Sequence, residues 1–221
     1  MSIGSVIDAR EMPVADVAEA VASVVFNGGT VIVPNDTSYL IGCDPYRSEA
    51  IDRIYAAKGR PDNRPLTMHV ASPQEFLEYD GDNPLAVVAA KRLLPAPVIL
   101  LVRKPKFISD ELAAGLSTLA FRVPDDPFSR GILERCGPLA GTTVALSGKP
   151  RYQGGDDDSM LPPADLLVRR GPTRYEQESS IVDLSGAHAR IVREGVISAA
   201  RLSELLGPVE RPTIKVRAQH T

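Results

Sequence analysis

Apolar residues recur along this chain with two different periods. From Pro13 to Phe26 they return every three or four positions, which predicts an amphipathic helix that ends at Asn27-Gly28-Gly29. By the same reasoning we predict further helices at 48–57, from Ser72, from Asn83 to about Leu94, at 127–136 and at 198–206. Apolar runs that are typical of strands cover 30–33, 66–70, 98–102, 119–123, 139–146, 166–168, 181–184 and 190–193.

Strands that are mixed with helices along the chain predict an α/β (α+β) domain with a central twisted mixed sheet flanked by helices. The 221 residues are enough to bury a substantial core. The sequence contains no internal repeat and no linker, so we expect a single domain over residues 1–208. Residues 209–221 are expected to form a mobile C-terminal tail.

Composition and charge narrow the class of protein. The formal net charge of −3 argues against a protein whose main task is to coat nucleic acid, although it permits a local cationic cleft. No window approaches the ~18 apolar residues of a membrane span, and Met1–Arg10 lacks the blocks of a secretory signal. We therefore expect a cytoplasmic protein without a membrane partner. Cys43 and Cys136 lack the spacing of a metal site and are expected to be reduced thiols.

Cationic side chains are concentrated in one short segment before a predicted strand. Lys58, Arg60 and Arg64 fall within seven residues. Pro61 lies among them and Pro65 follows directly, and both prolines stiffen the backbone. Fixed cations beside a strand edge are suited to hold the oxygens of a nucleotide polyphosphate. Polar residues also follow the strand at 30–33, so a second group of candidate ligands gathers at a strand end.

Five segments together resemble the YrdC-type threonylcarbamoyl-AMP synthases. PNDTSYLIGCDP and KGRPDNRPLTMHV are close to two motifs of that family, and LAFRVP, SSIVD and REG follow in the family's order. The segments begin at residues 34, 58, 119, 179 and 193. Each motif alone is weak, but the ordered set covers nearly the whole chain.

The resemblance implies a YrdC-like fold with a concave cationic cleft, and it implies an activity. Members of the family convert L-threonine, bicarbonate and ATP into threonylcarbamoyl-adenylate and pyrophosphate, the first step of a tRNA modification. ATP is then a substrate, and Mg²⁺ is carried on its phosphates rather than by a dedicated protein site. Asp36 and the run Asp156-Asp157-Asp158 are accordingly not predicted to be metal ligands.

The resemblance also assigns roles to individual residues. Those expected around threonine are Thr37, His69, Arg122 and Ser179. Those expected around ATP are Lys58, Arg60, Arg64, Thr118, Thr143 and Arg193, and Lys58 and Arg60 are the candidates for catalysis. The chemistry needs positioning and charge stabilisation more than side-chain reagents, which fits a sequence without a Ser-His-Asp or Cys-His set.

Several of these residues also have simpler structural explanations. Lys58 at a helix end would complement the helix dipole, and His69 on an apolar strand would be a hydrogen-bonded core histidine. Thr37 and Ser179 would be hydroxyls of turns or strand ladders. Arg122 follows so apolar a strand that a binding site is the favoured interpretation.

Some positions depart from the family pattern. Ala145 replaces an asparagine, which removes one hydrogen bond, and Leu40 replaces a glycine. Both changes bring the chain closer to the YciO-like branch of the same fold. Two alternatives therefore remain beside a synthase: a module that binds a nucleotide or RNA, double-stranded RNA included, without turnover, and an adenylate-forming enzyme that uses another amino acid. We expect a monomer or a weak dimer.

Overall fold

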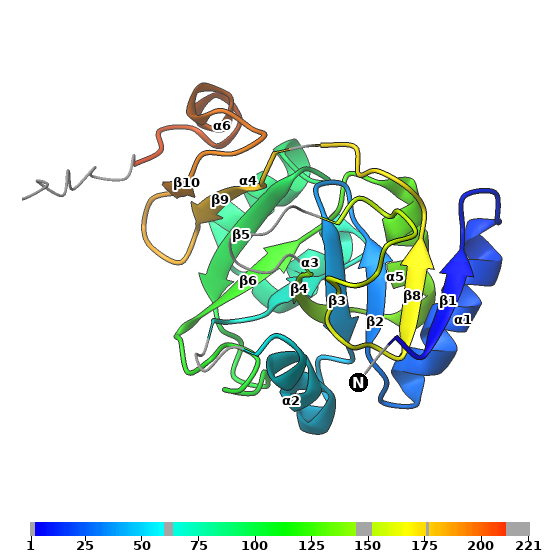
Figure 1. Cartoon of the computed structure of the whole chain (residues 1–221). Coiled ribbons are helices and arrows are strands. Elements are labelled where there is room, and N and C mark those ends of the chain that lie inside the picture. Colours follow the sequence, from blue (N-terminus) through cyan, green and yellow to red (C-terminus); the bar gives the residue numbers. More distant parts are fainter. Residues whose placement is uncertain (1–2, 60–63, 145–151, 176, 211–221) are drawn as a thin grey trace, which may run out of the picture.

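One ten-stranded mixed sheet organises the computed structural model, which describes residues 3–59, 64–144, 152–175 and 177–210 (Figure 1). The strands are β1 (Ser5–Asp8), β2 (Val31–Pro34), β3 (Tyr39–Cys43), β4 (Thr67–His69), β5 (Val98–Arg103), β6 (Thr118–Arg122), β7 (Leu139–Thr143), β8 (Leu166–Arg169), β9 (Ser180–Asp183) and β10 (Arg190–Arg193). In the described part of the chain the helices are α1 (Val14–Phe26), α2 (Ser48–Ala57), α3 (Pro73–Asp80), α4 (Pro84–Arg92), α5 (Pro127–Cys136) and α6 (Ala199–Leu206).

The strand order is β1-β8-β2-β3-β7-β4-β6-β5-β9-β10. β8 pairs in parallel with both β1 and β2, β4 pairs in parallel with β6, and β5 pairs in parallel with β9. The other neighbours are antiparallel. β1 and α1 lie at one end of the sheet, and β9, β10 and α6 lie at the other (Figure 1). The predicted single mixed sheet flanked by helices is confirmed.

The two faces of the sheet carry separate hydrophobic clusters, because successive strand residues point to opposite sides. On one face, residues such as Ile32, Met68 and Phe121 pack with α2, α3, α4 and α6. On the other face, Val31 and Val33 pack with α1 and α5. Among the described residues this second cluster includes Leu139 of β7 and reaches Ala71, just after β4.

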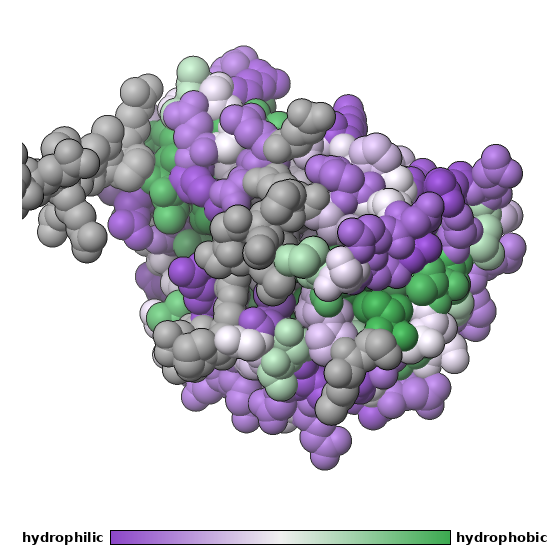
Figure 2. All heavy atoms as spheres, viewed as in Figure 1, coloured by the Kyte–Doolittle hydropathy of each residue, from purple (hydrophilic) through white to green (hydrophobic). Residues whose placement is uncertain are grey.

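Beyond β7 this face carries fewer large apolar side chains among the described residues. Register places Thr67, Ala120 and Leu101 side by side on β4, β6 and β5, on the same face as the α5 cluster. Thr67 and Leu101 are only half-buried. Viewed from the side shown in Figure 2, the surface is mostly hydrophilic, with hydrophobic residues exposed near β1 and β8. No helix among the described residues is long and apolar enough to cross a membrane.

The predicted helices are all present, with ends that shift by two residues or fewer. The pattern missed two strands. β1 is an edge strand with an exposed, partly polar pattern, so it carries no apolar run. β3 pairs with β2 as a hairpin, but it follows the polar 35–38 segment that we interpreted as a ligand loop. The strand predicted at 139–146 ends at Thr143, and residues 145–146 lie outside the described part of the chain.

The aromatic contacts of Phe121 give a test of the core. Its ring is fully buried, 5.5 Å from the ring of Phe76 and 4.9 Å from that of Tyr79. We expect Phe121→Ala to lower the free energy of unfolding by about 3–5 kcal/mol, because the cavity adds to the lost transfer energy. Phe107→Ala is the control, since Phe107 touches Tyr79 but is 66% exposed. Urea unfolding of both variants measures the difference, and equal losses would contradict this account of the core.

Candidate active site

Three segments that are distant in sequence meet around one buried cation. Arg122 ends β6 with a side chain that is 4% exposed. Its Nη2 donates to Asp36 Oδ1 in the β2–β3 loop, and its Nη1 donates to Ser179 Oγ just before β9. Thr37 Oγ1 lies 3.3 Å from Ser179 Oγ. The structure thus brings together Thr37, Arg122 and Ser179, three of the four residues that were predicted to surround threonine.

Asp36 is the residue at this cluster that the sequence analysis missed. Its side chain is fully buried, and its Oδ2 accepts the backbone N–H of Asp125 at 2.9 Å. The β2–β3 loop that carries Asp36 is fixed as well. The backbone N–H of Asp36 donates to Asn35 Oδ1 at 2.7 Å, and the carbonyl of Asp36 accepts the Tyr175 N–H at 2.8 Å. A buried arginine needs a counter-charge. The acidic residue inside the PNDTSYLIGCDP motif was the signal in the sequence that could have identified this counter-charge.

The environment of Arg122 leaves one donor unused. Burial lowers the pKa of its guanidinium, and the nearby Asp36 carboxylate opposes that shift. Arg122 Nε is buried and has no hydrogen-bond partner in the part of the chain that the structure describes. A buried polar group without a partner costs about 1–3 kcal/mol. This N–H therefore favours an acceptor oxygen supplied by a ligand.

His69 lies next to Arg122 on the same face, because the two residues are register partners in β4 and β6. Its Nδ1 is 3.0 Å from Thr67 O, and since a carbonyl only accepts, Nδ1 carries the proton. Burial and the positive charge of Arg122 lower the pKa of His69 to about 3. His69 is therefore a neutral imidazole at physiological pH, with Nε2 as a potential acceptor.

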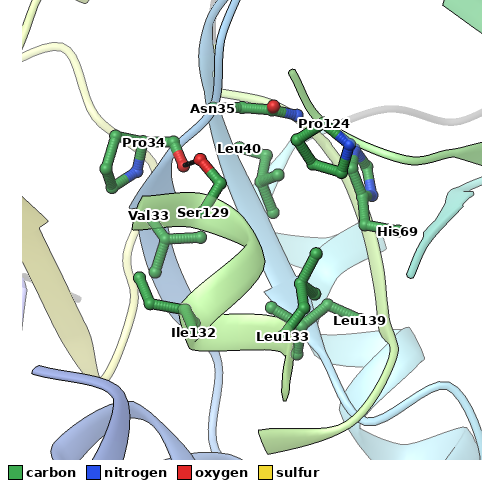
Figure 3. A pocket seen from close by; sticks show the side chains of 10 residues that line it. All are labelled: Val33, Pro34, Asn35, Leu40, His69, Pro124, Ser129, Ile132, Leu133 and Leu139. Carbon is green, nitrogen blue, oxygen red and sulfur yellow. Dashed lines mark hydrogen bonds between the residues drawn. The ribbon is translucent and has the colours of Figure 1, made fainter. Parts of the chain in front are cut away.

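A small cavity separates His69 from helix α5 (Figure 3). Its volume is about 10 Å³, close to the space of one water molecule. Asn35 and Pro124 lie at one side, and Ile132 and Leu133 of α5 line the opposite side. His69 is thus a hydrogen-bonded buried histidine that lies beside Arg122, and its contact with threonine stays a prediction.

The residues predicted to hold the nucleotide gather further along the same face. Thr67 is the register partner of Ala120 on β6 and of Gly141 on β7. Thr118 and Thr143 each lie two residues from these partners, toward the end of the sheet where β4 begins. Lys58, the C-cap residue of α2, donates from Nζ to Thr143 O at 2.8 Å. This lysine therefore reaches the strand end and does more than complement the helix dipole.

The remaining residues that were predicted to bind ATP do not all lie at this strand end. Arg64 is placed near this strand end through its backbone, whose carbonyl accepts the Tyr55 hydroxyl at 3.3 Å. Arg193 was predicted to face the nucleotide, and its Nε and Nη2 donate to Ser179 O at 3.1 and 2.9 Å. Its described contacts therefore join it to the Arg122 cluster. Arg60 and Ala145 lie outside the described residues.

The face thus presents two groups of donors at a fixed spacing. Thr118 and Arg122 are four residues apart on one extended strand, which is ~13 Å. Such an arrangement suits a ligand with a carboxylate at one end and phosphates at the other. Among the described residues, no group of three or more His, Cys, Asp or Glu side chains is arranged to hold a metal ion.

Comparison with known proteins identifies relatives over most of the chain. The Sua5_yciO_yrdC family model, described as "Telomere recombination", matches residues 23–195. The threonylcarbamoyl-AMP synthase of Bacillus subtilis is 30% identical over 196 residues, which are 85% of this chain and 56% of that protein. This chain therefore spans little more than half the length of that relative.

Solved structures agree with this relationship. Sua5 of Pyrococcus abyssi, crystallised with L-threonine, superposes with a TM-score of 0.81 at 26% identity and covers 93% of this chain and 62% of that one. YciO of Escherichia coli superposes with a TM-score of 0.78 at 23% identity, covers 93% of this chain and 100% of that one, and supports the fold alone. From the match of the family model over residues 23–195, we conclude that the chain belongs to the Sua5/YciO/YrdC family.

Proposed function

We propose that this protein forms threonylcarbamoyl-adenylate from L-threonine, bicarbonate and ATP, for the modification of tRNA in the cytoplasm. The observation that carries the proposal is the Arg122 guanidinium, which is buried, fixed by Asp36 and flanked by the Ser179 and Thr37 hydroxyls. The synthase activity of relatives and the threonine complex of the Pyrococcus protein support the same reading.

In this proposal Arg122 binds the α-carboxylate of threonine through parallel N–H donors. Thr37 and Ser179 read the threonine hydroxyl, since a pocket that hydrogen-bonds a hydroxyl rejects substrates that lack it. His69 contributes Nε2 as a neutral acceptor. Arg193 holds the Ser179 backbone in place through its two bonds to the carbonyl.

The nucleotide occupies the other end of the face. Lys58, Arg60 and Arg64 supply positive charge, and Thr118 and Thr143 supply hydroxyls. The amine of threonine forms a bond to the carbon of bicarbonate with loss of water, which gives the carbamate. An oxygen of this carbamate attacks the α-phosphorus, the bond from that phosphorus to the bridging oxygen breaks, and pyrophosphate leaves. The cations stabilise the negative charge that spreads over the phosphate oxygens during this step. Mg²⁺ would accompany the phosphates, as is usual for nucleotides.

Leu40 favours a second candidate, a YciO-like protein that binds a nucleotide or RNA with little or no synthase activity. Its side chain lies on the face of the sheet that carries the site, where the resembling synthases have a glycine. Leu40 Cδ1 would stand only 2.9 Å from a Cβ on either Gly42 or Gly141, so it occupies space that a glycine leaves open. The assay described next separates the two candidates.

Turnover of the three substrates tests the proposed synthase activity. Purified protein with ATP, threonine and bicarbonate should release pyrophosphate and accumulate the adenylate, measured by mass spectrometry. Arg122→Lys should lower kcat/KM for threonine by about 100-fold, because a lysine lacks the planar set of donors. That loss equals about 2.7 kcal/mol.

The matched control for this assay is Arg174→Lys, because Arg174 is an arginine that pairs with Asp125 at 2.9 Å while 61% of its side chain is exposed. It should retain nearly full activity. Nucleotide binding by the unaltered protein without any pyrophosphate release would contradict the synthase and support the YciO-like candidate.

The low pKa of His69 makes the stability of the folded protein depend on pH. Because that pKa falls from 6.5 in the unfolded chain to about 3 in the folded protein, the unfolded state binds the proton more readily. The contribution of His69 to stability is therefore complete above pH 6.5 and is lost as the pH falls toward 3. Between pH 6.5 and 4.5 this one group should remove about 2 kcal/mol.

His69→Asn should make stability less dependent on pH in that window, as measured by urea unfolding at several pH values. The comparison is made on the slope with pH, since the substitution also changes packing. His188→Asn is the control because His188 is exposed, and its slope should match that of the unaltered protein. Identical slopes for all three proteins would show that His69 is protonated as easily in the folded state as in the unfolded state.

A further inference from the structure

The protein binds some of the N–H donors of Arg122 and leaves one buried donor without a partner among the described residues. A guanidinium has five N–H donors in one plane. Asp36 accepts from Nη2 and Ser179 accepts from Nη1, so both ends of the fork are held by the protein. The Nε–H, although buried, has no partner among the described residues.

Two partners on different segments fix the plane of this guanidinium. Asp36 belongs to the β2–β3 loop and Ser179 precedes β9, so a rotation of the Arg122 side chain would break at least one of the two bonds. The edge that remains consists of Nε–H and the second N–H of a neighbouring Nη. Such an edge matches the two oxygens of a carboxylate.

This inference rests on the proposed function. We propose that Asp36 is a positioning residue that aims the Nε edge of Arg122 at the α-carboxylate of the amino-acid substrate, and that it thereby selects free amino acids over uncharged derivatives. Asp36 itself does not touch the substrate in this arrangement, since both of its oxygens are occupied by Arg122 and by the N–H of Asp125.

An aspartate is required at this position for a reason of hydrogen-bond polarity. Both partners of its carboxylate are donors, the Arg122 Nη2 and the Asp125 backbone N–H. An asparagine has the same shape but presents one oxygen and one NH₂ group, and the NH₂ group cannot accept. Asp36→Asn must therefore lose one of the two bonds while it keeps the volume of the side chain.

The experiment compares two probes that differ only in the carboxylate. Calorimetry measures the Kd of L-threonine and of L-threoninamide for the unaltered protein and for Asp36→Asn, each with ATP present. We expect the unaltered protein to bind threonine at least 100-fold more tightly than threoninamide. In Asp36→Asn this ratio should fall by 10-fold or more, while the Kd of ATP changes by less than twofold.

Asp165→Asn is the matched control. Asp165 also accepts from an arginine, Arg53 Nη2 at 2.7 Å, and from a backbone N–H, that of Thr30 at 2.6 Å, but it lies away from the Arg122 cluster. Its substitution should leave the ratio of the two Kd values unchanged. If Asp36 had a purely structural role, its substitution would weaken the binding of both probes equally, and that result would overturn the inference.

A second measurement reads the Arg122 donor directly in the unaltered protein. In the unaltered protein, the Arg122 Nε–H signal is assigned in a ¹⁵N spectrum by its loss in Arg122→Lys. Threonine should shift this signal and slow its exchange with water, and threoninamide should not. An unchanged signal with bound threonine overturns the inference while the proposed function stands. An unaltered protein that binds ATP but neither amino acid nor amide overturns both.

Discussion

The buried contact between Asp36 and Arg122 is the constraint on which the site depends. Two charges removed from water lose several kcal/mol of hydration each, and only good geometry with further hydrogen bonds recovers that loss. Here the further bonds come from Ser179 and from the backbone of Asp125. The pair therefore connects the β2–β3 loop, the end of β6 and the segment before β9. A further contact joins two of these segments directly, because Thr37 Oγ1 lies 3.3 Å from Ser179 Oγ.

The position of the site follows from which part of the sheet the helices cover. α1 and α5 cover part of the second face, and among the described residues their cluster includes β7 and Ala71, just after β4. Beyond β7 the same face carries Thr67 and Thr118, which are partly exposed, and the small side chain of Ala120. A sheet that was covered on both faces would be more stable but would have no room for a substrate. We place the substrates of the proposed function on this partly exposed part of the face.

Local patterns predicted the elements well because helix and strand periods are local properties. The predicted helices and most strands are present, and the structure places Arg122 in a buried cluster, while its role in binding stays a prediction. The partner of that arginine was not predictable in the same way. Asp36 and Arg122 are 86 residues apart, and no periodicity links them. The ordered family motifs predicted that their segments share a site, but not which acidic side chain would neutralise the cation.

The departure at Leu40 shows how a changed motif can leave the fold intact while it alters the surroundings of the site. A leucine at this position is accommodated because Gly42, two residues further along β3, and Gly141, the register partner of Gly42 on β7, have no side chains to meet it. The leucine then joins the α5 cluster and lines the small cavity beside His69. The Leu40 side chain therefore fills space beside the cavity next to His69 and leaves the hydrogen bonds of Arg122 in place. The change affects the shape of the site more than its charge, which is why the resemblance to the synthases survives in the cluster that would bind the amino acid.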